Sequence, residues 1–174
     1  MRLFEYVNQG GSIMYLLVLL NIIGVSLLLW RGFVIFDFKK NRHSLVDDII
    51  SSFHKLGTSN ENGNSLGILK DHISAQVHKL EFGLNTIKII ASISPLLGLL
   101  GTVVGILSAF TVIAQEGLNN PSLFAGGISM ALITTVGGLV VAIPHYIGYN
   151  YLVGILDDLE LELEEDIVPR IFGK

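Results

Sequence analysis

The chain has 174 residues, of which 51% are hydrophobic and 15% charged, and it contains no cysteine. This composition indicates a small membrane protein rather than a soluble multidomain protein. The net charge of −4 argues against nucleic acid as a partner, and the lack of cysteine excludes disulfide and thiolate chemistry.

The first predicted membrane span covers residues 13–36 and follows a short N-terminal segment, residues 1–12. The span carries Trp30 and Arg31 near its end, and both residue types anchor spans at a membrane surface. The apolar run is too long for a cleavable signal and lacks a small-residue cleavage site, so we expect no cleaved leader.

Basic residues are concentrated in the segment between the first two spans, residues 37–88. Eight of the 11 Lys and Arg lie between Arg31 and Lys88, so the positive-inside rule predicts a cytoplasmic segment, a periplasmic N-terminus and a cytoplasmic C-terminus. A helix beginning near residue 66 shows apolar residues at steps of three and four, and we expect it to continue unbroken into the second span. Its apolar face consists of Leu66, Leu69, Ile73, Val77, Leu80, Leu84 and Ile87.

Two further spans, residues 89–115 and 122–150, are predicted to form a hairpin around a turn at 116–121. Each exceeds the ~20 residues that cross a bilayer core, and the short turn requires the spans to run antiparallel and adjacent. Asn120 followed by Pro121 is a favourable helix start, because the side chain caps the helix and proline needs no N–H partner.

Small residues recur at helical spacing in both halves of this hairpin. Small residues four apart let membrane helices approach closely, because packing must replace the hydrophobic drive that lipid does not supply. Proline lies toward the far end of each span, where we expect it to kink the helix. The proposed packing residues are Gly98, Gly101, Gly105, Gly127, Ala131 and Gly138, with Ser94, Ala109, Thr135 and Ala142 in the same stripes, and the prolines are Pro95 and Pro144.

Three threonines are matched in depth within the hairpin. Counting from Leu118 as the tip, Thr102 lies sixteen residues before it, and Thr134 and Thr135 lie sixteen and seventeen after, all ~25 Å away along the helices. These hydroxyls are candidates to line an ion path. The alternative is that each hydroxyl donates to a carbonyl of the preceding turn.

The spans of the hairpin contain no Asp, Glu, Lys or Arg between residues 89 and 115 or between 117 and 156. Intramembrane ionisable groups usually mark proton carriers, so this chain cannot be the proton carrier by itself. His145 lies ~40 Å from the turn, which predicts a position among lipid headgroups. The other histidines lack the spacing and companions of metal ligands, and we expect no metal or cofactor site.

The segment after the third span, residues 151–174, is predicted to be an acidic cytoplasmic helix. Seven acids lie between Asp157 and Asp166 and form, on the simplest interpretation, a solvated face. If several copies form a ring, these acids would instead concentrate cations at the inner mouth of a pore. The apolar face of this helix consists of Leu152, Leu156, Leu159, Leu163 and Ile167.

Two segments in the same order resemble a known family. They are Pro95-Leu-Leu-Gly-Leu-Leu-Gly-Thr-Val-Val-Gly105, and Gly127-Ile-Ser-Met-Ala-Leu-Ile-Thr-Thr-Val-Gly-Gly-Leu-Val-Val-Ala-Ile-Pro144 followed by Tyr149-Asn150. The chain resembles the MotA/TolQ/ExbB proton-channel family, and its three-span size is similar to ExbB and TolQ rather than to the four-span MotA.

The resemblance implies an all-α membrane protein that forms a pentameric ring in the bacterial inner membrane. The ring would surround single-span ExbD- or TolR-like helices that carry an essential aspartate, with protons as the coupling ion and a TonB- or TolA-like protein as the output. The pore-facing threonines of the family map onto Thr102 and Thr135. Many relatives have glutamate where this chain has Met130.

The leading hypothesis is therefore an ExbB-like ring subunit of a motor that energises TonB-dependent outer-membrane transport. A TolQ-like role in the Tol-Pal envelope system and a non-conducting membrane scaffold remain as alternatives. An enzyme is not expected, because these residues do not assemble a nucleophile, a base and an orienting group. The sequence leaves open the pathway, proton against sodium, and the copy number.

Overall fold

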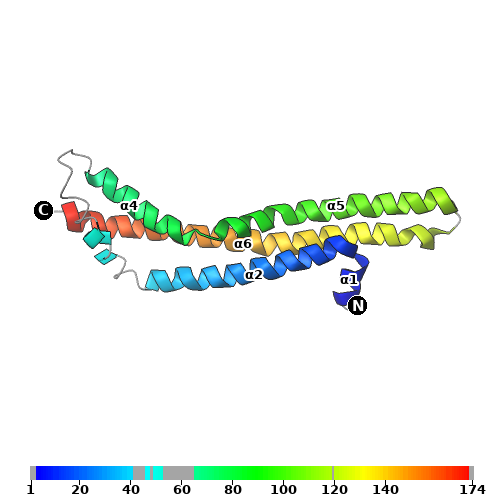
Figure 1. Ribbon diagram of the computed structural model, residues 1–174, viewed down its shortest axis with the longest axis horizontal. Coiled ribbons are helices and arrows are strands. Elements are labelled where there is room, and N and C mark those ends of the chain that lie inside the picture. The colour runs from blue at the N-terminus through cyan, green and yellow to red at the C-terminus, as the bar shows by residue number, and fades with distance from the viewer. Residues whose placement is uncertain (1–2, 41–45, 48, 53–64, 119, 173–174) are drawn as a thin grey trace. The chain divides into compact units, whose positions relative to one another are not determined.

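The computed structural model describes residues 3–40, 46–47, 49–52, 65–118 and 120–172. The labelled elements are α1 (Leu3–Gln9), α2 (Gly11–Lys40), α4 (Ser65–Leu80), α5 (Leu84–Glu116) and α6 (Pro121–Phe172) (Figure 1). Residues 46–47 and 49–52 are also helical. Three helices, α2, α5 and α6, are long and apolar enough to cross a membrane, which confirms the predicted all-α class with three candidate spans.

The chain divides into two compact units. The first unit comprises residues 1–28 and 86–149, and the second comprises residues 29–85 and 150–174. The first unit therefore holds the hairpin with the start of α2, and the second holds α4 with the ends of α2 and α6.

In the first unit α5 and α6 run antiparallel with their backbones in contact (Figure 1). A Cβ added to Gly105 would lie 2.5 Å from the carbonyl oxygen of Gly127, and one added to Gly138 would lie 2.6 Å from that of Ser94. Real Cβ atoms do not approach backbone this closely, so these positions require glycine. At these positions glycine lets α5 and α6 approach closely.

The turn of the hairpin joins Glu116 at the end of α5 to Pro121 at the start of α6. Gly117 has φ of 75° and donates its N–H to the Ile113 carbonyl oxygen at 2.8 Å. The Asn120 side-chain oxygen accepts the N–H of Ser122 at 3.2 Å, which confirms the predicted cap. Both helices continue through their prolines, and the kinks stay a prediction.

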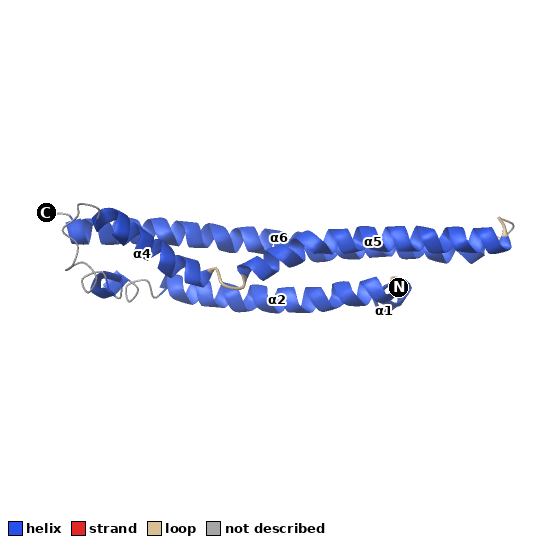
Figure 2. Ribbon diagram, turned by 45° about the horizontal axis from the view of Figure 1, so that its top comes forward, coloured by secondary structure: helices blue, strands red, loops and turns tan. Residues whose placement is uncertain are grey.

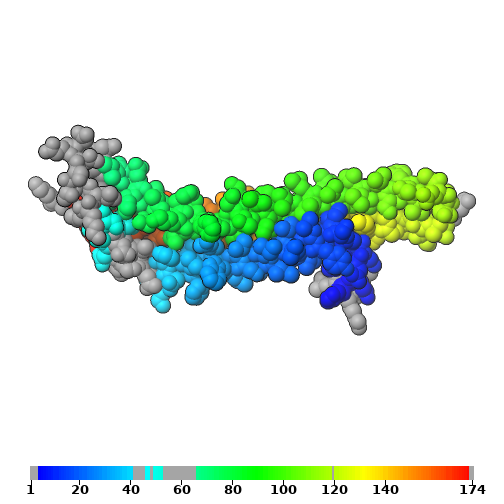
Figure 3. Space-filling view, viewed as in Figure 1, coloured from blue at the N-terminus to red at the C-terminus, as the bar shows by residue number. Residues whose placement is uncertain are grey.

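The start of α2 contacts α6 differently, through side chains that lie over glycines. Met14 lies over Gly137, and a Cβ added to Gly137 would be 2.7 Å from the Met14 sulfur. Leu28 lies over Gly148 in the same way. Figure 3 shows this blue N-terminal part of the first unit against the yellow part of α6. A small core lies between the helices, with Leu17, Ile90 and Val141 buried at its centre.

The second unit is held together by leucine and isoleucine side chains. The predicted apolar face that begins near residue 66 is buried, except for Leu66, which is 44% exposed. The predicted apolar face at the end of α6 is buried throughout. Both patterns therefore identify the residues that pack; from α6 they are Leu152, Leu156, Leu159, Leu163 and Ile167.

The predicted unbroken helix from residue 66 into the second span is wrong. Figure 2 shows a tan loop between α4 and α5, and residues 81–83 form a turn there. Gly83 has φ of 86°, a left-handed conformation that ends helices, and Leu84 N–H donates to the Glu81 carbonyl oxygen at 2.9 Å. The apolar period continues across the break, but the glycine conformation stops the helix.

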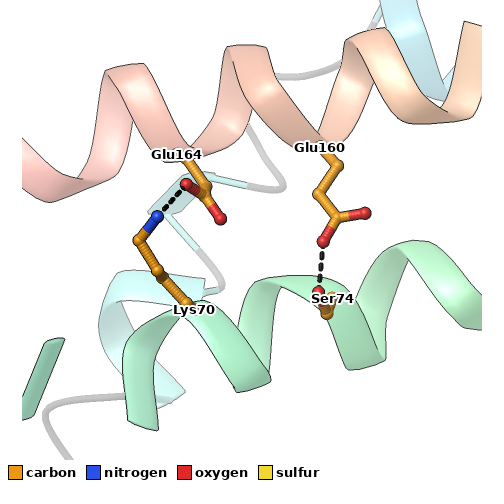
Figure 4. Close-up of polar contacts among 4 residues, drawn as sticks. All are labelled: Lys70, Ser74, Glu160 and Glu164. Atoms are coloured by element: carbon orange, nitrogen blue, oxygen red, sulfur yellow. Dashed lines mark hydrogen bonds and ion pairs between the residues drawn. The ribbon is translucent and has the colours of Figure 1, made fainter. Parts of the chain in front are cut away.

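The acids of α6, predicted to form a solvated face, also make surface contacts with other helices of the second unit. Lys70 of α4 forms an ion pair with Glu164 at 2.5 Å, and the Ser74 hydroxyl donates to Glu160 (Figure 4). Lys39 of α2 pairs with Glu162 at 3.3 Å. The periodicity of α6 could not reveal these ion pairs, because the lysines come from distant parts of the sequence. Asp157, Asp158 and Glu165 are exposed.

Candidate functional site

The candidate site is a pair of threonine hydroxyls, one from α5 and one from α6, beside the close contact that Gly98 makes with α6. The Thr102 Oγ1 and Thr135 Oγ1 atoms lie 3.3 Å apart. Gly98 makes this possible, because a Cβ there would lie 2.9 Å from the Thr134 carbonyl oxygen and 3.2 Å from the Thr135 Cα. The depth match found in the sequence therefore corresponds to a direct contact. The role of the pair in an ion path stays a prediction.

The hydrogen bonds around this pair form a chain that ends on the backbone. Thr102 Oγ1 lies 2.7 Å from the Leu99 carbonyl oxygen, to which it donates, so it can accept a hydrogen bond from Thr135. Each hydroxyl has one proton and two lone pairs. When Thr135 donates to Thr102, its own lone pairs remain available to an incoming donor or cation. Both threonines are partly exposed.

Thr134, the third predicted ion-path residue, has different surroundings. It is fully buried, donates to the Met130 carbonyl oxygen at 2.9 Å, and fills the space beside Gly101. The alternative, in which the hydroxyl donates to a carbonyl of the preceding turn, describes Thr134, as it also describes Thr102 with its bond to Leu99. Thr134 therefore packs against α5 as well as Thr135, which lies beside Gly98. A place for Thr134 beside an ion path stays a prediction.

His145, predicted at the level of the lipid headgroups, is covered by protein, and its depth in the membrane stays a prediction. The imidazole is fully buried in the first unit, with Nδ1 2.7 Å from the Val141 carbonyl oxygen. It lies over the bare Cα of Gly24 in α2, and within the described ranges Nε2 has no hydrogen-bond partner. Depth along one helix does not reveal which neighbour covers a side chain. The signal in the sequence was a glycine within the first span, Gly24, which leaves room for a ring.

Met130 contacts the start of α2. A Cβ added to Gly11 would lie 3.1 Å from the Met130 Cε, and Gly11 has φ of 63°. The side chain therefore packs against the tight turn between α1 and α2. This position holds an apolar contact within the first unit.

A protein family and several known proteins match part of the chain. Residues 44–165 match the model of the MotA/TolQ/ExbB proton channel family. The Biopolymer transport protein exbB1 of Vibrio cholerae is 41% identical over 81 residues, which are 46% of this chain and 36% of that protein. The Biopolymer transport protein ExbB of Aquifex aeolicus is 46% identical over 80 residues, 45% of this chain and 54% of that protein.

A protein of Methanothermobacter thermautotrophicus described as an ExbB homolog is 38% identical over 113 residues, 65% of this chain and 39% of that protein. The matches thus span between about a third and about a half of these relatives' length. The family match covers both spans of the hairpin and both threonines of the pair. This multi-pass membrane protein belongs to the MotA/TolQ/ExbB proton channel family, and among its members it resembles ExbB.

Proposed function

We propose that this chain is the ring subunit of a motor in the bacterial inner membrane that is driven by the proton-motive force. Its N-terminus faces the periplasm and its C-terminus the cytoplasm, in keeping with the distribution of Lys and Arg. The motor energises TonB-dependent transport across the outer membrane. Family membership and the names of the relatives support this proposal.

The observation that carries the proposal is the Thr102–Thr135 contact. Its hydroxyl chain can accept a hydrogen bond at a level where the hairpin spans contain no carboxylate. In this proposal the carboxylate that carries the proton comes from another chain, because the hairpin spans supply none. The partner proposed is an ExbD-like single span with an aspartate, which donates to the threonine pair when protonated.

The surface of the first unit supports assembly with further helices. α5 and α6 expose large apolar side chains, among them Leu107 at 65% and Val140 at 65%. Apolar side chains such as these are covered in a membrane by lipid, by neighbouring copies of the chain or by partner spans. A pentamer around ExbD-like helices, with a TonB-like protein as output, is the arrangement we propose from the family resemblance.

The test replaces both hydroxyls by methyl groups in Thr102→Val/Thr135→Val. We expect TonB-dependent uptake to fall about tenfold or more, because a hydrogen bond to a charged or transferring group is worth ~1.5–3 kcal/mol. The complex should still co-purify intact with its partners. Thr111→Val is the matched control, since Thr111 is on α5 and only donates to the Leu107 carbonyl oxygen at 2.9 Å.

The same experiment distinguishes two alternative functions. A TolQ-like subunit would leave uptake intact and instead make the double variant sensitive to detergents that test the outer envelope. A scaffold would show neither defect, because its helices would assemble without the hydroxyls. Normal energised function of both kinds in the double variant would end the proposed role of the threonine pair.

A further inference from the structure

Arg31 of α2 lies against the turn between α4 and α5 in the second unit. Its guanidinium carbon is 5.2 Å from the centroid of the Phe82 ring. A Cβ added to Gly83 would lie 3.0 Å from Nε and 3.5 Å from Nη2 of this arginine. The guanidinium is thus held by an aromatic ring and by a residue without a side chain, so its position is set by the turn.

The positive charge of Arg31 is not neutralised by the part of the chain that the structure describes, where no carboxylate pairs with it. Glu81, beside Phe82 in the turn, pairs instead with His78 Nδ1 at 2.8 Å. By contrast, Lys39 and Lys70 of the same unit both pair with acids of α6. A guanidinium has five N–H donors, and contact with a ring uses none of them. Arg31 is therefore a positioned cation with donors to spare.

The surroundings of Arg31 have the character of a membrane surface. Trp30, Phe33 and Phe82 are 69%, 76% and 78% exposed. Exposed aromatic rings beside an arginine at the end of an apolar span are typical of the level where lipid headgroups lie. The apolar run of α2 gives way to charge a few residues later, at Asp37.

We propose that Arg31, held by Phe82 and Gly83, binds the phosphate of an anionic phospholipid of the surrounding leaflet. The planar fork of a guanidinium matches two phosphate oxygens, and the exposed rings suit the glycerol and upper acyl region. An anionic headgroup supplies the negative charge that Arg31 lacks, whereas a zwitterionic headgroup brings a cation of its own. The site lies within the second unit and is independent of the coupling ion.

The experiment uses the only tryptophan of the chain, Trp30, which is adjacent to Arg31. The full chain, as its purified complex, is reconstituted into mixed bilayers of phosphatidylcholine and phosphatidylglycerol, one of which is brominated high in its acyl chains. Bromine quenches the fluorescence of a nearby indole, so the two labelling schemes report which lipid is enriched there. We expect about a three- to fivefold preference for phosphatidylglycerol.

Three variants separate a specific site from general attraction. Arg31→Gln should remove the preference, and Arg31→Lys should retain part of it because charge remains without the fork. Gly83→Ala keeps the arginine but places a methyl group against it, and should also lower the preference. Lys40→Gln, which removes an exposed cation from the same helix, should leave it unchanged.

Each contrary result overturns the proposal in a recognisable way. Equal quenching by both lipids in the unaltered protein would show no anionic selectivity. A preference that survives both Arg31→Gln and Gly83→Ala would be diffuse attraction rather than this site. Loss of the preference on adding inorganic phosphate at constant ionic strength would identify a free anion as the ligand. The size of each variant's complex shows whether it has assembled.

Discussion

The helix α6 packs in two different ways in the two units. In the first unit most of its buried residues are small, and the closest contacts are between backbones, as where Gly127 meets Gly105. In the second unit its buried residues are leucines and isoleucine, and the nearest polar contacts are ion pairs such as Glu164 with Lys70. One continuous helix thus uses small residues in one unit and large apolar residues in the other.

The difference follows from the solvent that each unit is built for. In water, a leucine gains free energy simply by leaving solvent, roughly 1.5–3 kcal/mol when fully buried. In lipid that gain is absent, and helices associate through close van der Waals contact, which small residues permit. Substitutions that enlarge a side chain should therefore destabilise the first unit most. Substitutions that shorten a side chain should destabilise the second unit most.

The largest effect is expected from Gly105→Leu in the first unit. The new side chain would begin 2.5 Å from the Gly127 carbonyl oxygen and 2.8 Å from the Ala131 nitrogen, and backbone atoms cannot rotate away. Overpacking a core usually costs about 1–3 kcal/mol, and this case should exceed that range. We expect no assembled complex after gentle extraction and size-exclusion chromatography.

Gly126→Leu is the matched control, because a Cβ at Gly126 would meet no atom within 4 Å among the residues that the structure describes. It should yield a complex of normal size. If the two variants behave alike, the hairpin does not depend on the contact of its backbones, and the comparison drawn above fails for the first unit.

An intermediate effect is expected from Leu159→Ala in the second unit. Leu159 is fully buried between the helices, and deletion of such a side chain costs about 2–5 kcal/mol. Hydrogen exchange of α4 amides in the intact complex should become faster by the corresponding factor, while the hairpin stays protected. Leu161→Ala, two residues away and 61% exposed, should change exchange little. Equal effects of the two variants would refute the assignment of this face.

The parts of this fold that follow local rules were predictable from the sequence. The hairpin, its glycine contacts and its cap depend on residues close together in the chain or on a repeat along one helix. Both apolar faces of the second unit follow from a 3.6-residue period. The break at Gly83 was missed, because the period runs through it while the conformation of a single residue ends the helix.

The candidate site was predictable in depth but not in rotation about the helix axis. Counting residues placed Thr102 level with Thr134 and Thr135, and the structure brings Thr102 into contact with Thr135. Adjacent residues on a helix differ by 100° in direction, so only the real interface decides which of the two is buried. His145 illustrates the same limit, since its cover comes from Gly24, more than a hundred residues earlier.

The smallest effect is expected from Glu164→Gln, which removes the ion pair with Lys70. The two side chains are 22% and 48% exposed, so water and salt screen their attraction, and such pairs contribute about 0–1 kcal/mol. Hydrogen exchange of α4 should accelerate slightly at low salt and not at 1 M salt, where screening acts over ~3 Å. A double-mutant cycle with Lys70→Met isolates the pair from its neighbours. A coupling well above 1 kcal/mol that persists at high salt would mean that polar contacts, rather than leucines, hold α4 to α6.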